Sequence, residues 1–201
     1  MQANTIELNA PLTRAMHDGA DRIGDITADA FRNDPFNRWL FGNFRAMEIA
    51  FIGLARHLYT RRGFCYRLGD EGAAMWMLPG GDSSLPLITL PTLLRSIMAS
   101  SRGGFTRIRR TTEAMEAHHP QFPHAYLFTI GVRQTAQGKG LGRELFKPML
   151  EACDREGVPA YLENSNPENR GFYNAHGFER VEMIYPVEGC PPLEAMLRKP
   201  R

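Results

Sequence analysis

The sequence predicts one α/β domain that spans residues 1–201. Helix-like and strand-like runs alternate along the chain, and we detect no internal repeat. A glycine-rich loop, residues 137–142, lies between a strand-like run and a helix-like run. The chain of 201 residues is long enough for one core that buries about 70% of the surface of the unfolded chain.

The composition is typical of a globular protein, with 43% hydrophobic and 23% charged residues. A formal net charge of +2 argues against bulk nucleic-acid binding, which needs a strongly basic face. The cysteines, Cys65, Cys153 and Cys190, lack the spacing of a disulfide framework or a zinc site. No apolar run approaches the ~18 residues of a membrane span, and no leader-like segment opens the chain. We therefore expect a soluble, cytoplasmic protein.

The first half of the chain alternates helices with short strands. Apolar residues at helical spacing predict a helix that Asp18 caps and Asp34-Pro35 ends. Turn residues at 69–72 separate two strand-like runs. The other elements expected here are strands at Thr5–Leu8, Phe64–Leu68 and Ala73–Leu78, and helices at Arg45–Arg62, Pro91–Ser100 and Phe105–His118.

The second half of the chain gives clearer signals. The helix after the glycine loop is expected to end at Gly157, and Pro148 inside it should kink it. Asn166 followed by Pro167 predicts the start of a short helix. The strands expected here are Ala125–Val132, Ala160–Asn164, Phe178–Tyr185 and Glu194–Arg198.

The glycine loop itself predicts an anion site. Its backbone N–H groups can converge on a phosphate, and the N-terminus of the next helix adds about half a positive charge. A Rossmann dinucleotide site is one alternative, because Glu163 follows the loop at the distance of a ribose-binding acid. Against it, Arg143 stands where a third glycine belongs, and too little chain follows for further βαβ units. A Walker A loop is excluded because neither Ser nor Thr follows Lys139.

The segment from residue 123 to the end carries a set of ordered motifs. The pattern Q-x-x-G-x-G follows a strand that ends in Gly131-Val132. Downstream come G-V-P-A-Y-L-E, the run from Asn169 to Tyr173, a G-F pair and a terminal R-K-P. Together they resemble the GNAT N-acetyltransferases, and within them the puromycin N-acetyltransferase-like proteins. Before residue 123 the resemblance is only one of general element order.

The resemblance implies a mixed, mostly antiparallel sheet, flanked by helices and splayed where acetyl-CoA inserts. Residues 1–122 would mainly shape the acceptor side, and residues 123–201 mainly the acetyl-CoA side. Loop amides would hold the pyrophosphate, and the edge of residues 130–132 would pair with pantetheine like an added strand. The cofactor-binding residues implied in this way are Ile130, Gly131, Val132, Gln137, Gly138, Lys139, Gly140, Leu141, Gly142, Arg143, Asn164, Asn169, Phe172 and Tyr173.

Two residues are candidates for catalysis. Asn169 and Tyr173 lie four apart and so share a helix face. The resemblance makes Tyr173 the general acid for the departing CoA thiolate, a role that suits a phenol with an ordinary pKa near ~10. Glu163 is our candidate base, directly or through water, because it lies near the end of a strand beside the cofactor. The alternatives are a packed aromatic at Tyr173 and a structural carboxylate at Glu163.

These expectations define a function. We expect direct transfer of acetyl from acetyl-CoA to a primary amine of a small molecule in a ternary complex, with Trp39, Phe41 and Phe128 at the acceptor. Core packing is the alternative for these aromatics. Ala125 and Phe128 depart from the puromycin pattern, so another small amine is expected. The alternative function is an acetyl-CoA sensor without transfer activity, and an exposed C-terminal strand would allow a homodimer.

Three histidines precede the strand at Ala125–Val132. His118 and His119 are adjacent, and His124 opens the strand. The chain lacks further ligands at suitable spacing, so no metal site is expected. We expect these histidines to cap the preceding helix, with a role as base or substrate contact as the alternative.

Overall fold

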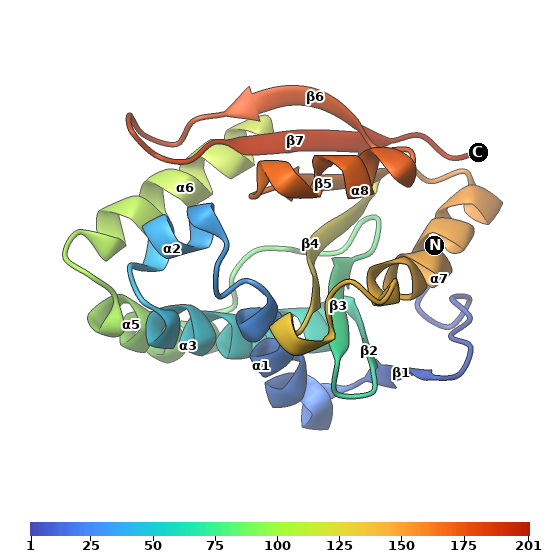
Figure 1. Ribbon diagram of the computed structural model, residues 1–201, viewed down its shortest axis with the longest axis horizontal. Coiled ribbons are helices and arrows are strands. Elements are labelled where there is room, and N and C mark those ends of the chain that lie inside the picture. The colour runs from blue at the N-terminus through green and yellow to red at the C-terminus, as the bar shows by residue number, and fades with distance from the viewer.

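A seven-stranded sheet with the strand order β1-β2-β3-β4-β5-β7-β6 runs through the molecule (Figure 1). The computed structural model describes residues 1–201. All neighbouring strands are antiparallel except β4 and β5, which are parallel. The strands are β1 (Leu12–Ala15), β2 (Phe64–Leu68), β3 (Gly72–Met77), β4 (Ala125–Val132), β5 (Ala160–Asn164), β6 (Glu179–Ile184) and β7 (Leu193–Arg198).

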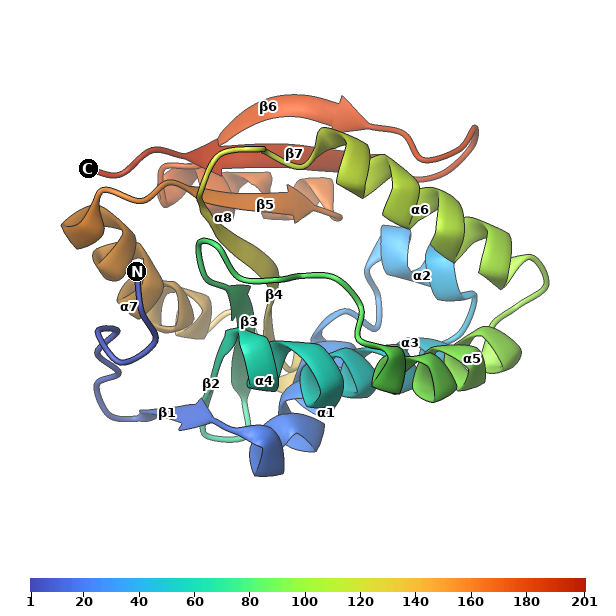
Figure 2. The ribbon, with the colours of Figure 1, turned by 180° about the vertical axis from the view of Figure 1, so that it is seen from behind.

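Helices cover both faces of this sheet (Figures 1 and 2). Met75 of β3 packs in the apolar cluster of α1 and α3, with Ile23 and Phe51. The next residue, Trp76, packs in the cluster of α7, with Phe146, because successive strand side chains point to opposite faces. The helices are α1 (Ala20–Ala30), α2 (Pro35–Phe41), α3 (Phe44–Leu54), α4 (Thr60–Arg62), α5 (Leu90–Ala99), α6 (Gly104–His118), α7 (Leu141–Glu156) and α8 (Arg170–Ala175).

Strands β4 and β5 pair only at their N-terminal ends. The last rung joins Leu127 to Leu162, and beyond it the strands diverge, as Figure 1 shows. On its other side β4 continues to pair with β3 as far as Val132. A bulge places Phe128 opposite no β3 residue, because Met75 pairs with Thr129 and Trp76 with Leu127. One edge of β4 is therefore open at its C-terminal end.

Most of the expected elements are confirmed. The expected helix over Arg45–Arg62 is formed by α3, a π-helical turn (Ala55–Tyr59) and α4 in succession. Asn166 accepts a hydrogen bond from Glu168 N (3.1 Å), as expected of the cap before the turn at Pro167–Asn169 that leads into α8.

Three expectations are wrong. Thr5–Leu8 is not a strand, because Thr5 N turns back to the Gln2 carbonyl oxygen (3.1 Å), and β1 forms later. Asp18 lies in a 3-10 turn, and its side chain caps no helix. The C-terminal strand, β7, is not exposed, because it pairs with β5 on one side and with β6 on the other. Strand β6 forms that edge of the sheet.

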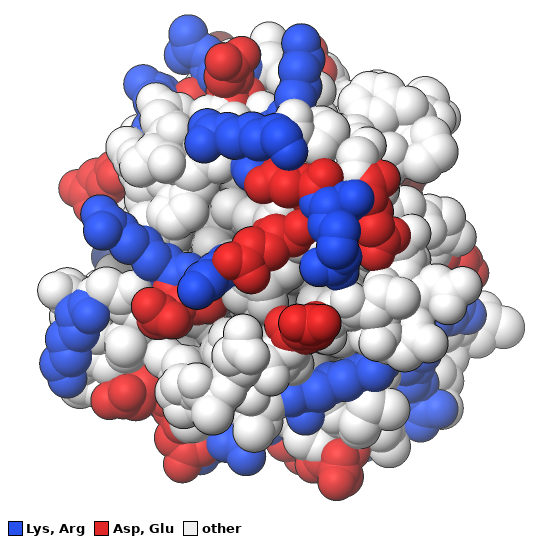
Figure 3. Space-filling model, turned by 90° about the vertical axis from the view of Figure 1, so that its right-hand side faces the viewer, with Lys and Arg blue, Asp and Glu red and all other residues white.

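The surface carries charges of both signs. Figure 3 views the side on which α7 lies in Figure 1, and basic and acidic side chains alternate there. One exposed pair of opposite charges on α7 is Lys147 with Glu151. The three cysteines are buried and form no disulfide. None of the helices has the length and apolar character needed to cross a membrane.

A partly buried ion pair fixes α7 to the sheet. Arg198 of β7 donates from Nη1 and Nη2 to the two carboxylate oxygens of Asp154, both at 2.7 Å. The Arg198 side chain is only 4% exposed. Hydrogen bonds from Arg198 hold the pKa of Asp154 below its ordinary value. The pair thereby holds the helix whose N-terminus carries the glycine loop.

Asp154→Asn should lower the free energy of unfolding by about 3 kcal/mol at pH 7, because it leaves a buried guanidinium without its counter-charge. Asp154 has a lower pKa in the folded state than in the unfolded state. Its stabilisation is therefore present above the unfolded pKa and is lost as the pH falls through the folded pKa. Urea titrations at neutral and acidic pH measure this. The difference from wild type should shrink on acidification, whereas Glu151→Gln on the same helix should change little at any pH.

Candidate functional site

The glycine loop lies at the N-terminus of α7. Gly138 and Gly140 have φ angles of 78° and 81°, a region that glycine adopts without strain. Gln137 Nε2 donates to the Val132 carbonyl oxygen (3.0 Å) and closes the loop onto the end of β4. The space around both glycines is open, since a Cβ at either would meet no atom within 4 Å. The first N–H groups of a helix have no partner within it, so this loop can bind a phosphate.

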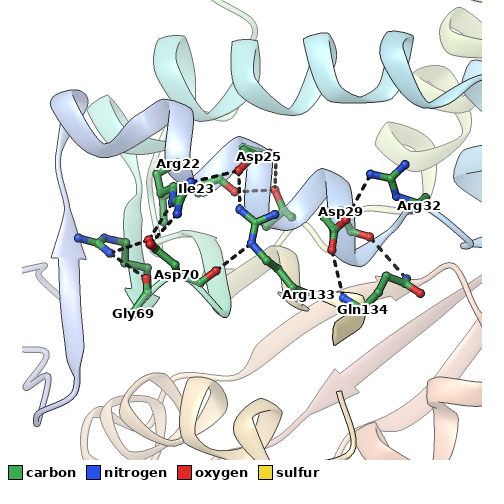
Figure 4. Close-up of polar contacts among 12 residues, drawn as sticks. Arg22, Ile23, Asp25, Asp29, Arg32, Gly69, Asp70, Arg133 and Gln134 are labelled. Atoms are coloured by element: carbon green, nitrogen blue, oxygen red, sulfur yellow. Dashed lines mark hydrogen bonds and ion pairs between the residues drawn. The ribbon is translucent and has the colours of Figure 1, made fainter. Parts of the chain in front are cut away.

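Arg133 and Gln134, which precede the glycine loop, bind to α1 (Figure 4). Arg133 forms an ion pair with Asp25, and its Nε donates to the Asp70 carbonyl oxygen (2.8 Å) in the turn between β2 and β3. Gln134 N donates to Asp29 Oδ2 (3.1 Å). Figure 4 shows these contacts in a row along α1. The loop therefore starts from a fixed position relative to the sheet.

A cleft of about 570 Å³ opens beside the loop. The cleft lies between the end of β4, the start of α7, helix α8 and the turn that follows α1. Of the predicted cofactor residues, the cleft is lined by Ile130, Gly131, Val132, Gln137, Gly138, Gly140, Leu141, Gly142, Arg143, Asn169, Phe172 and Tyr173. Lys139 and Asn164 do not line it. Lys139 is exposed in the loop, and buried Asn164 donates to Glu194 Oε2 (3.0 Å).

Tyr173 reaches this cleft from α8. Arg170, one turn earlier on that helix, donates to Glu194 Oε1 of β7 (2.8 Å), which fixes the helix against the sheet. The Tyr173 hydroxyl makes no hydrogen bond within the protein, although the residue is only 7% exposed. Burial, with a smaller effect of the Asp34 carboxylate, raises the pKa of Tyr173 above its ordinary value. The phenol is therefore protonated and free to donate.

A buried acid, Asp34, also lines the cleft; from the sequence it is expected only as the end of a helix. Asp34 begins α2, where its Oδ1 accepts from Asn37 N (2.8 Å). Its Oδ2 accepts from Ser165 Oγ (2.7 Å), just past the end of β5. Burial raises the pKa of Asp34, against the opposing effect of these hydrogen bonds. The available signal was the acid-proline pair, which predicts only the end of a helix.

Glu163 lies outside that cleft lining. It is the first residue of β5 beyond the last rung with β4, and its side chain is 3% exposed. Its Oε1 has no hydrogen-bond partner. Burial, followed by the charge of Glu163, raises the pKa of both Tyr59 and Tyr126, so these phenols face the carboxylate. The structure thus places a buried carboxyl group in an aromatic chamber where β4 and β5 diverge.

The three expected acceptor aromatics are not in one cavity. Trp39 lines a separate hollow between α2 and α3, with Phe44 and Met47. Phe41 is buried in the core of that region. Phe128, at the bulge of β4, stacks on Tyr59 with ring centroids 4.5 Å apart. Phe128 therefore forms a wall of the chamber around Glu163.

The histidines before β4 divide into two roles. His118 Nδ1 donates to the Ala114 carbonyl oxygen (2.7 Å) in the last turn of α6, as expected of a capping residue. His119 is the C-cap residue of α6, and its backbone N–H donates to the Glu116 carbonyl oxygen (3.3 Å). Its ring lies against His124, Tyr126 and Tyr161. No group of three or more His, Cys, Asp or Glu side chains is arranged to hold a metal ion.

Comparison with known proteins decides the family. Residues 104–178 match the acetyltransferase (GNAT) family model. An uncharacterized N-acetyltransferase of Schizosaccharomyces pombe is 30% identical over 188 residues, which cover 86% of this chain and 76% of that protein. The chain belongs to the GNAT acetyltransferase family.

Solved structures agree with this assignment. A Corynebacterium glutamicum protein, described as histone acetyltransferase HPA2 and related acetyltransferase, is 25% identical with a TM-score of 0.66, covering 94% of this chain and 96% of that one. Arylalkylamine N-acetyltransferase 2 of Aedes aegypti has a TM-score of 0.60 at 10% identity, covering 96% and 100%. At that identity the likeness concerns the fold alone. The predicted GNAT fold, with its mostly antiparallel open sheet, is confirmed.

Membership makes the chain an acyltransferase, and GNAT enzymes use acetyl-CoA as co-substrate. The residues of the cleft fit such a group. The open glycine loop can take a pyrophosphate, and the unpaired edge of β4 can take the amides of pantetheine. Neither comparison identifies an acceptor, and the puromycin-like pattern receives no separate support.

Proposed function

We propose that this protein transfers an acetyl group from acetyl-CoA to the primary amine of a small molecule, by direct attack in a ternary complex. The observation that carries the proposal is the single cleft that gathers the glycine loop, the end of β4, Asn169, Tyr173 and Asp34. A protein that only binds acetyl-CoA would need neither the unpaired phenol of Tyr173 nor the buried carboxyl group of Asp34.

The donor would lie along the divergence of β4 and β5. Amides at the N-terminus of α7 would hold its pyrophosphate, and Asn169 would contact pantetheine. The thioester would then reach the bulge of β4 at Phe128, where a backbone N–H could stabilise the oxyanion, an effect worth about 3 kcal/mol in known enzymes. Bound acetyl-CoA would supply only the activated acetyl group.

The proton steps would use the chain's own residues. The amine nitrogen bonds to the thioester carbon, and the carbon–sulfur bond breaks. Tyr173 would give its phenolic proton to the departing thiolate. Glu163 would take the proton that the amine loses, directly or through water. Asp34 would attract the cationic amine into the cleft before it reacts.

The expected acceptor aromatics fit this scheme unequally. Phe128 lies at the point where acetyl and amine would meet. Trp39 and Phe41 belong to α2, whose N-cap is Asp34, so they would shape the acceptor side through the position of that helix. The acceptor is expected to be a small amine other than puromycin.

Tyr173→Phe should lower kcat about a hundredfold, because the thiolate loses its acid. The variant should fold normally, since the hydroxyl has no partner within the protein. The measurement is release of CoA thiol with a panel of small amines, and Tyr185→Phe, an exposed tyrosine, is the matched control. An unchanged kcat would remove Tyr173 from the mechanism. If wild type binds acetyl-CoA but acetylates no amine of the panel, the alternative function, an acetyl-CoA sensor, is favoured.

Asp34→Asn should raise KM for the amine about tenfold or more while kcat changes less, because a charge that attracts the amine is lost. Asn is as good a helix cap as Asp, so stability should hold. Asp34→Ala should in addition lose about 1 kcal/mol of stability, because the helix cap is removed.

Because burial raises the pKa of Asp34, the affinity of wild type for the amine should fall on acidification at a higher pH than an exposed aspartate would give. Equal KM values for wild type and Asp34→Asn would contradict this role.

A further inference from the structure

The chamber around Glu163 connects to the surface on the side away from the cofactor cleft. His119 Nδ1 lies 3.8 Å from Glu163 Oε1. The Glu163 side chain is 3% exposed and that of His119 is 29% exposed. The histidine thus touches both the buried carboxyl group and solvent.

The hydrogen bonds around His119 fix where its protons lie. The Phe122 carbonyl oxygen can only accept, so His124 Nδ1 donates to it (2.8 Å). Burial, the largest cause, lowers the pKa of His124, so that ring is neutral and its Nε2 is an acceptor. His119 Nε2, 3.1 Å from it, must therefore donate. A neutral His119 then presents the lone pair of Nδ1 to Glu163.

This arrangement requires one proton between His119 and Glu163. An ionised carboxylate and a nitrogen lone pair that face each other at this distance repel in a chamber of low polarity. A single proton, on either the carboxyl group or the imidazole, removes the repulsion. At 3.8 Å His119 Nδ1 is not hydrogen-bonded to Glu163 Oε1, which has no hydrogen-bond partner within the protein.

Few other groups can compete for this proton. The walls supplied by β4, β5 and the π-helical turn carry the phenols of Tyr126, Tyr161 and Tyr59. Burial first, and the charge of Glu163 second, raises the pKa of each of these phenols, so they stay neutral. Glu182 of β6 lies outside the chamber near His118, 3.9 Å from its Nε2.

A hollow of about 190 Å³ lies on the outer side of the histidine pair. His119 and His124 line it together with Tyr126, and the loop that follows β3 forms its opposite wall. In Figure 2 this loop and the segment that joins α6 to β4 face the viewer. The hollow is separate from the cofactor cleft, with which it shares no lining residue.

We propose that His119 is the relay through which the proton of the acceptor amine leaves Glu163 for solvent in this hollow. The inference rests on the proposed function. The resting pair holds one proton, between the Glu163 carboxyl group and His119 Nδ1. The ammonium group of the acceptor gives a second proton to Glu163, and the pair releases one proton through the partly exposed His119 ring to water in the hollow. Glu163 and His119 again share one proton, and the net change is one proton moved from amine to solvent.

His119→Ala tests the relay, with His118→Ala as the matched control on the neighbouring residue. His119→Ala should lower kcat about tenfold or more, and added imidazole, small enough for the hollow, should restore it. The deficit should shrink at alkaline pH, where the acceptor enters as the free amine. His118→Ala should behave as wild type. Full activity of His119→Ala, or a deficit that neither imidazole nor alkaline pH reduces, would overturn the proposal. His119→Gln provides the same test if the alanine variant does not fold.

A second measurement is independent of catalysis. Nitrogen-15 NMR of the imidazole groups, with the His119 signals assigned from their loss in His119→Gln, reports which nitrogen of the neutral ring carries the proton. The proposal requires a proton on Nε2, and a ring that carries a proton on Nδ1 alone overturns it. If wild type binds acetyl-CoA but acetylates no amine, the proposed function fails and this measurement alone decides whether the relay geometry exists.

Discussion

The parting of β4 and β5 is the constraint on which the rest of the structure depends. Two parallel strands that stay paired would leave no free backbone edge and no space for a ligand. Here the last rung joins Leu127 to Leu162, and the bulge at Phe128 turns β4 away immediately afterwards. Every group with a proposed role, from the glycine loop to Tyr173, Asp34 and the Glu163 chamber, lies along or beside that opening.

Keeping the opening fixed requires ties across it. Arg133 and Gln134 hold the end of β4 to α1, and the pair of Arg198 with Asp154 holds α7 to β7. Ser165 donates to Asp34, which joins the end of β5 to the start of α2. These charged and polar groups hold the two sides at a set separation, so the proposed donor and acceptor sites are formed before a ligand binds.

Much of the donor side could be predicted from sequence because its signals are local. Glycines that need positive φ, a cap at Asn166 and strand-like runs depend on neighbours in the chain, and β4, β5 and the loop are where the sequence predicts them. The acceptor side depends on contacts between distant segments. The sequence predicts only a helix boundary at Asp34, because Ser165 and Tyr173 are distant in the chain. His119 caps α6 as predicted, but its place opposite Glu163 depends on the folded sheet. The predictions for Thr5–Leu8 and Asp18 failed because local turns form there instead: Thr5 N bonds to the Gln2 carbonyl oxygen, and Asp18 lies in a 3-10 turn.

Calorimetric titration with acetyl-CoA tests the central claim, that the opening between β4 and β5 with its glycine loop is a donor site. Wild type should bind with a dissociation constant below about 1 mM. Gly140→Val should weaken binding strongly, whereas Gly80→Val, at another open glycine with a positive φ of 76°, should not. No binding by wild type at millimolar acetyl-CoA, or equal binding by both valine variants, would contradict the account.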